Sequence, residues 1–529
     1  MLFILSNWAR TVVLVVVGFI LTPLMIEAFG LVLFGLLILV QQITISMVRP
    51  VRAAVTSTLV KSISEARGSG EENGFSSVFT NGVGLMTMLF TALVVLGILA
   101  IFFAKNILDF PAEQVSNVQL AIAGEVIIIS MSSFTAPWLA LFLLDQRPIL
   151  YNADLAIRRW LDMIAFLLAL MPFGLEIFQR FIIIRTSLCM MHFLVRVLVA
   201  RRVMVEARVK PSLLNWSRMG QLLRLGGLTT GQPFSNFNFF VLDNYLFNIV
   251  FGTIYNGLYA IVTQLRGYAR RFGSQVFDGM VAIAADIHER GEKQTNIRAM
   301  LAVSRITAGV MMLSTGIIII FFRPLIDLWL GSRLRMDETL LSVLSYESAI
   351  DLIWGILAML LVGGIMLETA TAASKFLYGM GLVKRYAGVL FTSGITKFVV
   401  SVLVVVLIIN FIPDLETRPD VPLIFPGITL ICQFIFFGIV MPHRVTRLTG
   451  ISVATWCWHA IIKPLMSAVI PLGVGVILIL TIQEWNWAWL VSSILLVGLL
   501  CMPSSFFLLF EADERKRIWH VIGRVRSRR

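Results

Sequence analysis

The feature that most constrains this chain is a succession of long apolar segments that runs almost from end to end. A transmembrane helix needs roughly 20 mainly apolar residues, and hydropathy predicts about 14 such helices here. Hydrophobic residues make up 58% of the 529 positions and charged residues only 14%, which is too little polar surface to cover a soluble globule. We therefore expect an all-α, polytopic membrane protein.

The first apolar segment, 8–29, has spanning length and lacks a small-residue cleavage site, so we expect it to be retained rather than removed as a signal peptide.

The distribution of basic residues predicts the orientation in the membrane. Lys and Arg gather in alternate loops, and such positive loops stay in the cytoplasm. We expect an even number of spans with both termini in the cytoplasm. The net charge of +13 then reflects topology and attraction to anionic membrane lipids, without nucleic acid as a partner.

A short motif occurs twice, each time between two apolar segments. Its members are Phe29, Gly30, Gly35 and Gln42 in the first copy and Phe251, Gly252, Gly257 and Gln264 in the second. Internal duplication is typical of secondary transporters, whose halves move around a site between them. We expect two six-helix repeats followed by two extra C-terminal helices.

This arrangement predicts five parts. They are an N-terminal six-helix bundle at 1–205, a cytoplasmic amphipathic connector at 206–224, a second six-helix bundle at 225–450, two additional transmembrane helices at 451–512 and a basic cytoplasmic tail at 513–529. The connector mixes basic and apolar residues as membrane-surface helices do. For the tail, anchoring on anionic lipid is the expectation and a specific partner site is the alternative.

Several short motifs follow one another along the chain. They are Thr22-Pro23 before Gly30, Ser64-Glu65-Ala66-Arg67, Asp243-Asn244-Tyr245, Gly257-Leu258-Tyr259-Ala260 and Arg323-Pro324-Leu325-Ile326-Asp327-Leu328-Trp329-Leu330-Gly331. Together and in this order, they resemble the polysaccharide flippases of the multidrug/oligosaccharidyl-lipid/polysaccharide export superfamily. The resemblance spans most of the first 450 residues. Two departures leave the branch open. Asp278-Gly279 stands where members often carry a proline, so that Gly279 sets the bend there or the bend is absent, and about 14 spans replace twelve.

The resemblance implies a function in polysaccharide biosynthesis. A protein of this kind moves an isoprenoid-diphosphate-linked oligosaccharide from the inner to the outer leaflet of the bacterial cytoplasmic (inner) membrane, by alternating access and without ATP hydrolysis. The product would serve O-antigen or lipopolysaccharide synthesis, with a polysaccharide polymerase and chain-length machinery as possible partners. A cation-coupled multidrug exporter of the same superfamily is the first alternative.

A membrane-embedded polysaccharide polymerase or ligase is the third hypothesis, and it would need a large outward loop that the topology does not show. The sequence contains no Walker-type phosphate loop and no nucleophile elbow, so we expect no enzyme activity and no cofactor. The histidines are scattered and the four cysteines show no CxxC pairing, so a metal site is not expected either.

Five arginines in predicted spans are candidate substrate ligands, because charge within a bilayer is costly and must face a cavity or a partner. Arg49 and Arg52 share a face of the second span, and Arg266 and Arg270 are four apart on the eighth, next to Arg271. Guanidinium groups suit a diphosphate through paired hydrogen bonds. The alternatives are contact of Arg49 and Arg52 with headgroups, and pairing of the other three with acids such as Asp278 or Asp243. With the first and seventh spans, these helices are expected to enclose a cationic cavity between the halves.

Three further residues are candidates for ion coupling or for counter-ions. Asp243 lies in the middle of the seventh span, and Glu368 and Lys375 are seven apart on one face of the tenth. The remaining charges are interpreted as structural. Asp154, Arg158 and Asp162 are expected to neutralise one another along one helix face. Glu125, Arg185, Arg196 and Lys397 are isolated in the sequence.

Overall fold

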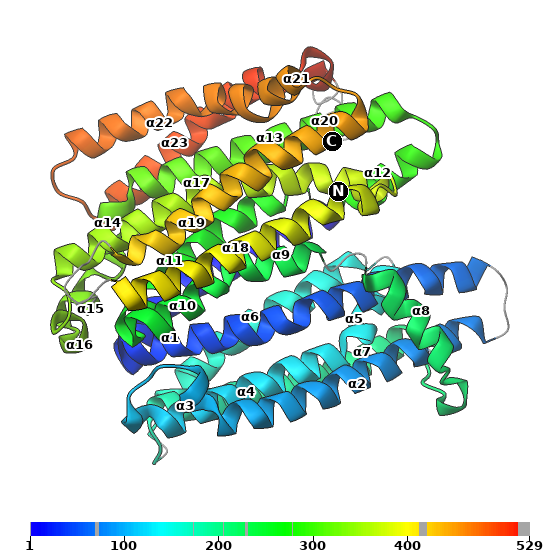
Figure 1. Cartoon of the computed structure of the whole chain (residues 1–529), viewed down its shortest axis with the longest axis horizontal. Coiled ribbons are helices and arrows are strands. Elements are labelled where there is room, and N and C mark those ends of the chain that lie inside the picture. Colours follow the sequence, from blue (N-terminus) through cyan, green and yellow to red (C-terminus); the bar gives the residue numbers. More distant parts are fainter. Residues whose placement is uncertain are drawn as a thin grey trace, which may run out of the picture. The chain divides into compact units, whose positions relative to one another are not determined.

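The computed structural model describes residues 2–68, 73–145, 147–172, 174–204, 206–227, 231–277, 279–411 and 421–516. Every regular element in these ranges is a helix (Figure 1). Ten helical intervals among them are long and apolar enough to cross a membrane. The chain is therefore an all-α, multi-pass membrane protein, as predicted. Most of the basic tail, 517–529, lies outside the described residues.

The chain divides into two compact units. Unit 1 comprises Met1–Ala260 and Leu390–Glu416, and unit 2 comprises Ile261–Val389 and Thr417–Arg529. These limits follow contacts within the fold rather than repetition in the sequence. The five predicted parts of the chain therefore remain a prediction.

Unit 1 is built on the long helix α1, which packs against α2, α4 and α6, while α7 packs against α4 and α6. Phe29 of α1 meets three further phenylalanines, Phe166, Phe178 and Phe181, in its core. The elements are α1 (Leu2–Gly68), α2 (Gly74–Phe102), α3 (Ala104–Ile107), η1 (Ala112–Gln114), α4 (Val115–Phe134), α5 (Ala136–Leu144), α6 (Pro148–Ala169), α7 (Ile177–Val203), η2 (Pro211–Leu213), α8 (Trp216–Gly227), α9 (Gly231–Phe240), α10 (Leu242–Phe251), the start of α11 (Thr253–Ser274) and most of α18 (Val383–Phe411).

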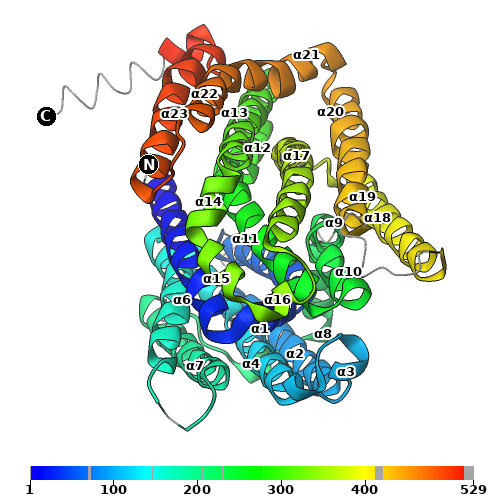
Figure 2. The same ribbon diagram turned by 90° about the vertical axis from the view of Figure 1, so that its left-hand side faces the viewer.

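Unit 2 is built on α17, which packs against α12, α13 and α19, while α22 and α23 form a hairpin beside α13 (Figure 2). Its elements are the rest of α11, α12 (Met280–Glu289), α13 (Lys293–Ile320), α14 (Phe322–Trp329), α15 (Gly331–Met336), α16 (Glu338–Leu341), α17 (Tyr346–Gly379), the start of α18, η4 (Val421–Leu423), α19 (Ile424–Gln433), η5 (Phe434–Val440), α20 (Met441–Thr449), α21 (Val453–Cys457), η6 (Trp458–Ile462), α22 (Lys463–Thr481) and α23 (Trp487–Leu508). The elements η5 and η6 are π-helical.

The two copies of the sequence motif share an unusual backbone conformation. Gly30 interrupts α1 with φ 78° and ψ 164°, and Gly252 separates α10 from α11 with φ 84° and ψ −175°. A positive φ strains any residue with a side chain, which accounts for a glycine at both places. The break at Gly30 divides the 67 residues of α1 into the first two predicted spans.

A second pair of motif glycines brings two helices of unit 1 into direct contact. A Cβ atom on Gly35 of α1 would lie 2.7 Å from the Cα of Gly257 on α11, and one on Gly257 would lie 2.7 Å from the carbonyl oxygen of Leu31. Buried amides join the same crossing, because Asn244 donates to Gln42 at 3.1 Å. The repeated Gly and Gln positions of the first copy thus hold α1 against α10 and α11.

Two predicted spans are interrupted in the structure. The segment predicted at 254–285 is divided between α11 and α12, and Gly279 caps α12 with φ 87°, so the bend at that glycine is present. The segment predicted at 233–250 is divided between α9 and α10, at Val241. Such breaks shorten the continuous apolar helices, and the count of about 14 spans stays a prediction.

The connector between the predicted repeats contains an amphipathic helix, α8. Its residues Met219 and Leu222 are buried against Val55 and Leu85, whereas Trp216 is exposed. The helix packs on α1 and α2. Its apolar face is therefore covered by unit 1.

The last two helices are an integral part of unit 2. Along α13, Gly309 faces Leu509 and Gly316 faces Leu472, with so little space that a Cβ on either glycine would lie 2.7 Å or less from a leucine methyl carbon. At the far end of α13 the Phe321 ring lies 5.7 Å from that of Trp485, centroid to centroid. Small residues at such an interface let membrane helices approach closely.

Candidate functional site

The arginines of α11 form the core of the candidate site in unit 2. Arg266 and Arg270 are one helical turn apart, and Arg266 is 4% exposed. Arg270 donates from Nε to Oε1 of Glu368 on α17 at 2.5 Å. Two residues that the sequence predicted separately, Arg270 as a ligand and Glu368 as a counter-ion, are therefore bonded to each other.

The Arg270–Glu368 pair is asymmetric in exposure. The side chain of Glu368 is 2% exposed and that of Arg270 is 26% exposed. The second oxygen of Glu368, Oε2, is buried and has no hydrogen-bond partner among the described residues. A buried carboxylate oxygen without a partner lacks a hydrogen bond that it would make in water. The pair therefore combines an accessible cation with an incompletely satisfied anion.

Arg266 is held by an amide from α19. With the Gln433 amide oriented so that its oxygen faces Arg266, Nη2 of the arginine donates to it at 3.2 Å and the amide nitrogen donates to the carbonyl of Gly363 at 3.3 Å. A Cβ on Gly363 would come within 3.2 Å of the amide carbon, which is tighter than nearly all real contacts. The glycine thus makes room for the amide that orients Arg266.

The remaining candidates of unit 2 are Arg271 and Lys375, which lie close in the sequence to Arg270 and Glu368 respectively. Arg271 is half-buried, and its guanidinium lies 6.0 Å from the ring centroid of Tyr268. Lys375 is half-buried on α17, two turns beyond Glu368. Their predicted roles stay predictions.

Unit 1 carries the arginines predicted on the second span. Arg52 of α1 donates from Nη1 to the hydroxyl of Ser132 on α4 at 3.0 Å. The side chain of Arg49 lies outside the described residues. The predicted role of Arg49 and Arg52 in a cavity between the two halves therefore stays a prediction.

Asp243 of α10 is paired with Lys397 of α18, a residue that is isolated in the sequence. Lys397 of α18 donates to its carboxylate, and both side chains are fully buried. The ammonium also donates to Ser401 at 3.0 Å. Lys397 is therefore part of a buried ion pair although it is isolated in the sequence, because a partner 154 positions away in the chain leaves no local signal.

The other buried charges of unit 1 form two clusters between helices. Arg185 of α7 joins Glu125 of α4 and Asp162 of α6, and Arg196 of α7 joins Asp154 of α6 at 2.6 Å. Glu125, Arg185 and Arg196 are thus isolated in the sequence but paired between helices in the fold.

The acids of α6 were also expected to neutralise one another along one face together with Arg158. Asp154 and Asp162 instead bond across to α7, because membrane burial favours direct partners on neighbouring helices over solvent. Asp162 is bonded in addition to Arg159 of its own helix at 3.1 Å.

Unit 1 also contains an apolar cavity of about 790 Å³. Helices α1, α2, α3 and α4 line it, and it is open to the surface, since Met47 and Leu96 in its wall are 63% and 59% exposed. Its walls are almost wholly hydrocarbon, so the cavity suits an alkyl chain rather than a sugar.

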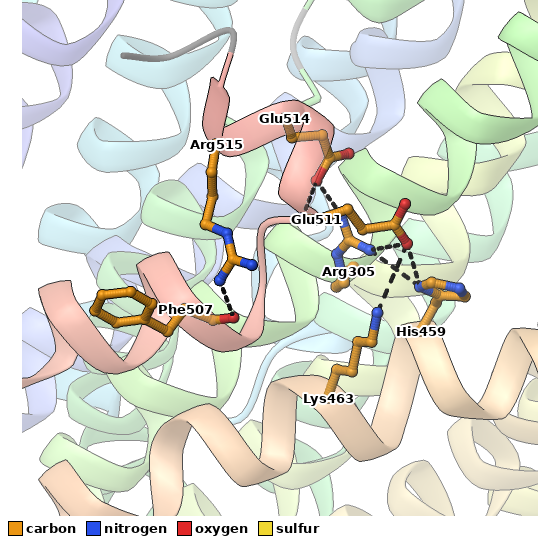
Figure 3. Close-up of polar contacts among 7 residues, drawn as sticks. All are labelled: Arg305, His459, Lys463, Phe507, Glu511, Glu514 and Arg515. Atoms are coloured by element: carbon orange, nitrogen blue, oxygen red, sulfur yellow. Dashed lines mark hydrogen bonds and ion pairs between the residues drawn. The ribbon is translucent and has the colours of Figure 1, made fainter.

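Unit 2 also contains an ionic cluster around Arg305 of α13, which is not evident from the sequence (Figure 3). Its carboxylates follow α23, more than 200 positions later. Among the described residues, no group of three or more His, Cys, Asp or Glu is placed to hold a metal ion.

The chain matches no family model and no curated protein. It is similar to solved structures. The lipid II flippase MurJ, in an inward closed conformation, matches with a TM-score of 0.63 and 13% identity, over 96% of this chain and 98% of that one. The MATE multidrug transporter DinF-BH matches with a TM-score of 0.57 and 14% identity, over 85% and 96%.

The eukaryotic MATE transporter AtDTX14 gives a TM-score of 0.54 at 15% identity, over 85% of this chain and 96% of that one. A further match, at a TM-score of 0.53, is a MATE transporter described as a member of the MOP superfamily. All these proteins are transporters. At identities this low, the TM-scores show a shared fold, so the chain has the fold of these transporters.

Proposed function

We propose that the protein is a flippase for an isoprenoid-diphosphate-linked oligosaccharide. It would move this lipid from the inner to the outer leaflet of the bacterial cytoplasmic membrane by alternating access, with both termini in the cytoplasm. Cell-surface polysaccharide synthesis would use the product, and a polymerase with its chain-length machinery would act next. The observation that carries the proposal is that Arg266 and Arg270 lie one turn apart on α11 and that Arg270 is paired with Glu368 of α17.

The charge of this group favours an anionic substrate. Arg266 and Arg270 lie one turn apart on the same helix, so their guanidinium groups can approach one diphosphate together. Arginine binds phosphate oxygens through two parallel hydrogen bonds. The same cations repel a cationic drug, which makes the flippase the better supported of the two transporter functions.

Glu368 gives the site a way to exchange its anion. In the structure its carboxylate neutralises Arg270, which is the role that a bound diphosphate would take over. Arg270 is 26% exposed and Glu368 only 2%, so an incoming anion would meet the guanidinium rather than the carboxylate. Substrate binding therefore competes with an internal ion pair.

The apolar cavity of unit 1 supports a substrate with a long hydrocarbon chain. Its volume of about 790 Å³ is larger than one isoprenoid unit needs and its walls offer few polar groups. We propose that part of the carrier lipid occupies it.

Asp243 remains the candidate for ion coupling. Its ion pair with Lys397 limits the ways in which a coupling cation could bind the carboxylate. The lysine ammonium already neutralises the carboxylate in a fully buried position. A coupling cation would have to displace this ammonium, since two cations on one buried carboxylate repel each other. Membrane potential remains the alternative driving force.

The cation-coupled multidrug exporter stays the second candidate, because the fold is shared with MATE transporters. Purified full-length protein in liposomes separates the two. One arm follows a fluorescent undecaprenyl-diphosphate oligosaccharide between leaflets, and the other follows a cationic rhodamine dye across the same membrane under sodium and proton gradients. Leaflet exchange of the lipid without movement of the dye supports the flippase. Movement of the dye alone overturns it.

A further inference from the structure

The ionic cluster around Arg305 joins two candidate membrane spans, α13 and the interval Val453–Thr481, to the segment that follows α23 (Figure 3). Arg305 donates from Nη1 to Glu511 at 3.2 Å and from Nη2 to Glu514 at 2.6 Å. Its Nη1 also lies 3.0 Å from Nδ1 of His459 on η6, and the ammonium of Lys463 on α22 lies 3.6 Å from Glu511. Two carboxylates thus match two permanent cations.

The cations of the cluster are fixed by the fold. The side chain of Arg305 is 1% exposed, although it carries a full charge. It lies on the same stripe of α13 as Gly309, where Leu509 packs closely just after α23. Removing its partners would leave a buried, unpaired charge, which is strongly unfavourable. Some anion must therefore occupy this place at all times.

The carboxylates are held much less firmly. Glu511 is 52% exposed and Glu514 is 32% exposed, and both belong to the short segment 511–516 at the end of the described chain. Local contacts hold that segment, such as the bond from Arg515 to the carbonyl of Phe507 at 3.0 Å. A polar surface segment with little apolar burial opens at low free energy.

We propose that Arg305 and Lys463 form a binding site for the phosphate group of a membrane lipid, and that Glu511 and Glu514 occupy this site in its place. The inference is independent of the proposed transport function. His459 positions the guanidinium through its ring nitrogen. When the C-terminal segment moves away, a phosphate takes the oxygen positions that the two carboxylates hold.

Two observations favour a lipid phosphate. The two carboxylates come directly after α23, an apolar helix of spanning length that ends at Leu508, so the site adjoins the end of a candidate membrane span. In addition, Nε of Arg305 is buried and has no hydrogen-bond partner among the described residues. A phosphate has more acceptor oxygens than a carboxylate and can satisfy such an extra donor.

The test measures lipid binding to the full-length protein by native mass spectrometry. Phosphatidylglycerol, phosphatidylcholine and inorganic phosphate are titrated separately. For Glu511→Gln/Glu514→Gln, which removes the internal competitor, we expect phosphatidylglycerol affinity to rise about fivefold, as for partly exposed ion pairs. Lys463→Gln should lower it. Asp513→Asn is the matched control, because Asp513 is an exposed carboxylate on the same segment and the affinity of this variant should equal that of the wild type.

A second measurement uses the wild type alone and does not depend on the folding of a variant. Phosphatidylglycerol should increase the rate of tryptic cleavage after Arg515, and phosphatidylcholine should not. Equal effects of phosphatidylglycerol and inorganic phosphate would assign the site to free phosphate rather than lipid and overturn the lipid assignment. The proposal would be overturned if the double variant bound phosphatidylglycerol with unchanged affinity and phosphatidylglycerol left cleavage after Arg515 unchanged. The two carboxylates would then serve only to hold the C-terminal segment against α13 and α22.

Discussion

Gly35 and Gly257 touch through their backbones, at the equivalent position of the two copies of the repeated motif. A Cβ on Gly35 would lie 2.7 Å from both the Cα and the nitrogen of Gly257. The glycines that precede them in the motif, Gly30 and Gly252, have closely similar positive φ angles. Contact between equivalent positions is what a two-fold related pair of repeats produces, so the crossing supports an origin by duplication.

The closeness of this crossing predicts a large effect for a single methyl group. Gly35→Ala should destabilise the protein by about 1–3 kcal/mol, since backbone atoms cannot move aside as a flexible side chain would. Gly220→Ala, at a helical glycine with open space around its Cβ position, is the matched control and should not destabilise. Thermal unfolding in detergent, followed by size-exclusion chromatography, compares the two. Equal melting temperatures would contradict the close crossing.

Hydropathy was sufficient to predict the architecture because a bilayer permits few alternatives to apolar helices. The repeated motif could be recognised in the sequence because the backbone has a positive φ at Gly30 and Gly252, which favours glycine at both places. The breaks at Val241 and Gly279 were harder to place. Both lie inside apolar segments, where tertiary contacts rather than composition decide whether a helix continues.

The buried Asp243–Lys397 pair predicts strong coupling between two residues far apart in the sequence. Lys397→Met alone should cost about 3–5 kcal/mol, because it leaves an uncompensated buried carboxylate. Asp243→Asn/Lys397→Met should recover most of that loss. A double-mutant cycle on the free energy of unfolding measures the coupling. Additive effects of the two substitutions would contradict the ion pair.

The exchange of anions at Arg270 predicts opposite effects for the two members of its ion pair. Glu368→Gln should raise the affinity for farnesyl diphosphate about fivefold, because the internal competitor is neutralised. Arg270→Gln should lower it by a similar factor. Calorimetric titration of the purified protein gives both values. Weaker binding in Glu368→Gln would mean that the carboxylate supports the site instead of competing for it.

The ionic cluster at Arg305 predicts that the C-terminal segment 511–516 becomes less stable in acid. Burial alone would raise the pKa of Glu511, but Arg305, Lys463 and His459 outweigh it and hold that pKa below its ordinary value of 4.5. A lowered folded pKa stabilises the folded segment above the ordinary value, and the stabilisation is lost as pH falls through the folded pKa. Hydrogen–deuterium exchange of residues 509–516, corrected for intrinsic rates, should therefore accelerate below pH 4.5. Exchange that slows in acid would contradict this ion pairing.

The ion pairs were the least predictable part of the site. A sequence shows that Arg185, Arg196 and Lys397 are charged and in apolar surroundings, but their partners come from other helices at long separations. Where spacing along one helix suggested self-neutralisation, as for Asp154 and Asp162, packing against α7 decided otherwise. The α11 arginines were chosen as candidates from the cost of burying charge together with their place in the family resemblance.

The central claim, that the α11 cations act on the diphosphate of a lipid substrate, is tested most directly by leaflet exchange of a fluorescent undecaprenyl-diphosphate oligosaccharide in proteoliposomes. Wild type, Arg266→Glu and Arg270→Gln are compared with Arg290→Gln, which removes an exposed arginine paired to Asp286 on α12. The account predicts that wild type and Arg290→Gln exchange the lipid and that both α11 variants, folded and present at equal density, lose at least roughly tenfold in rate. Exchange at the wild-type rate in both α11 variants would contradict it.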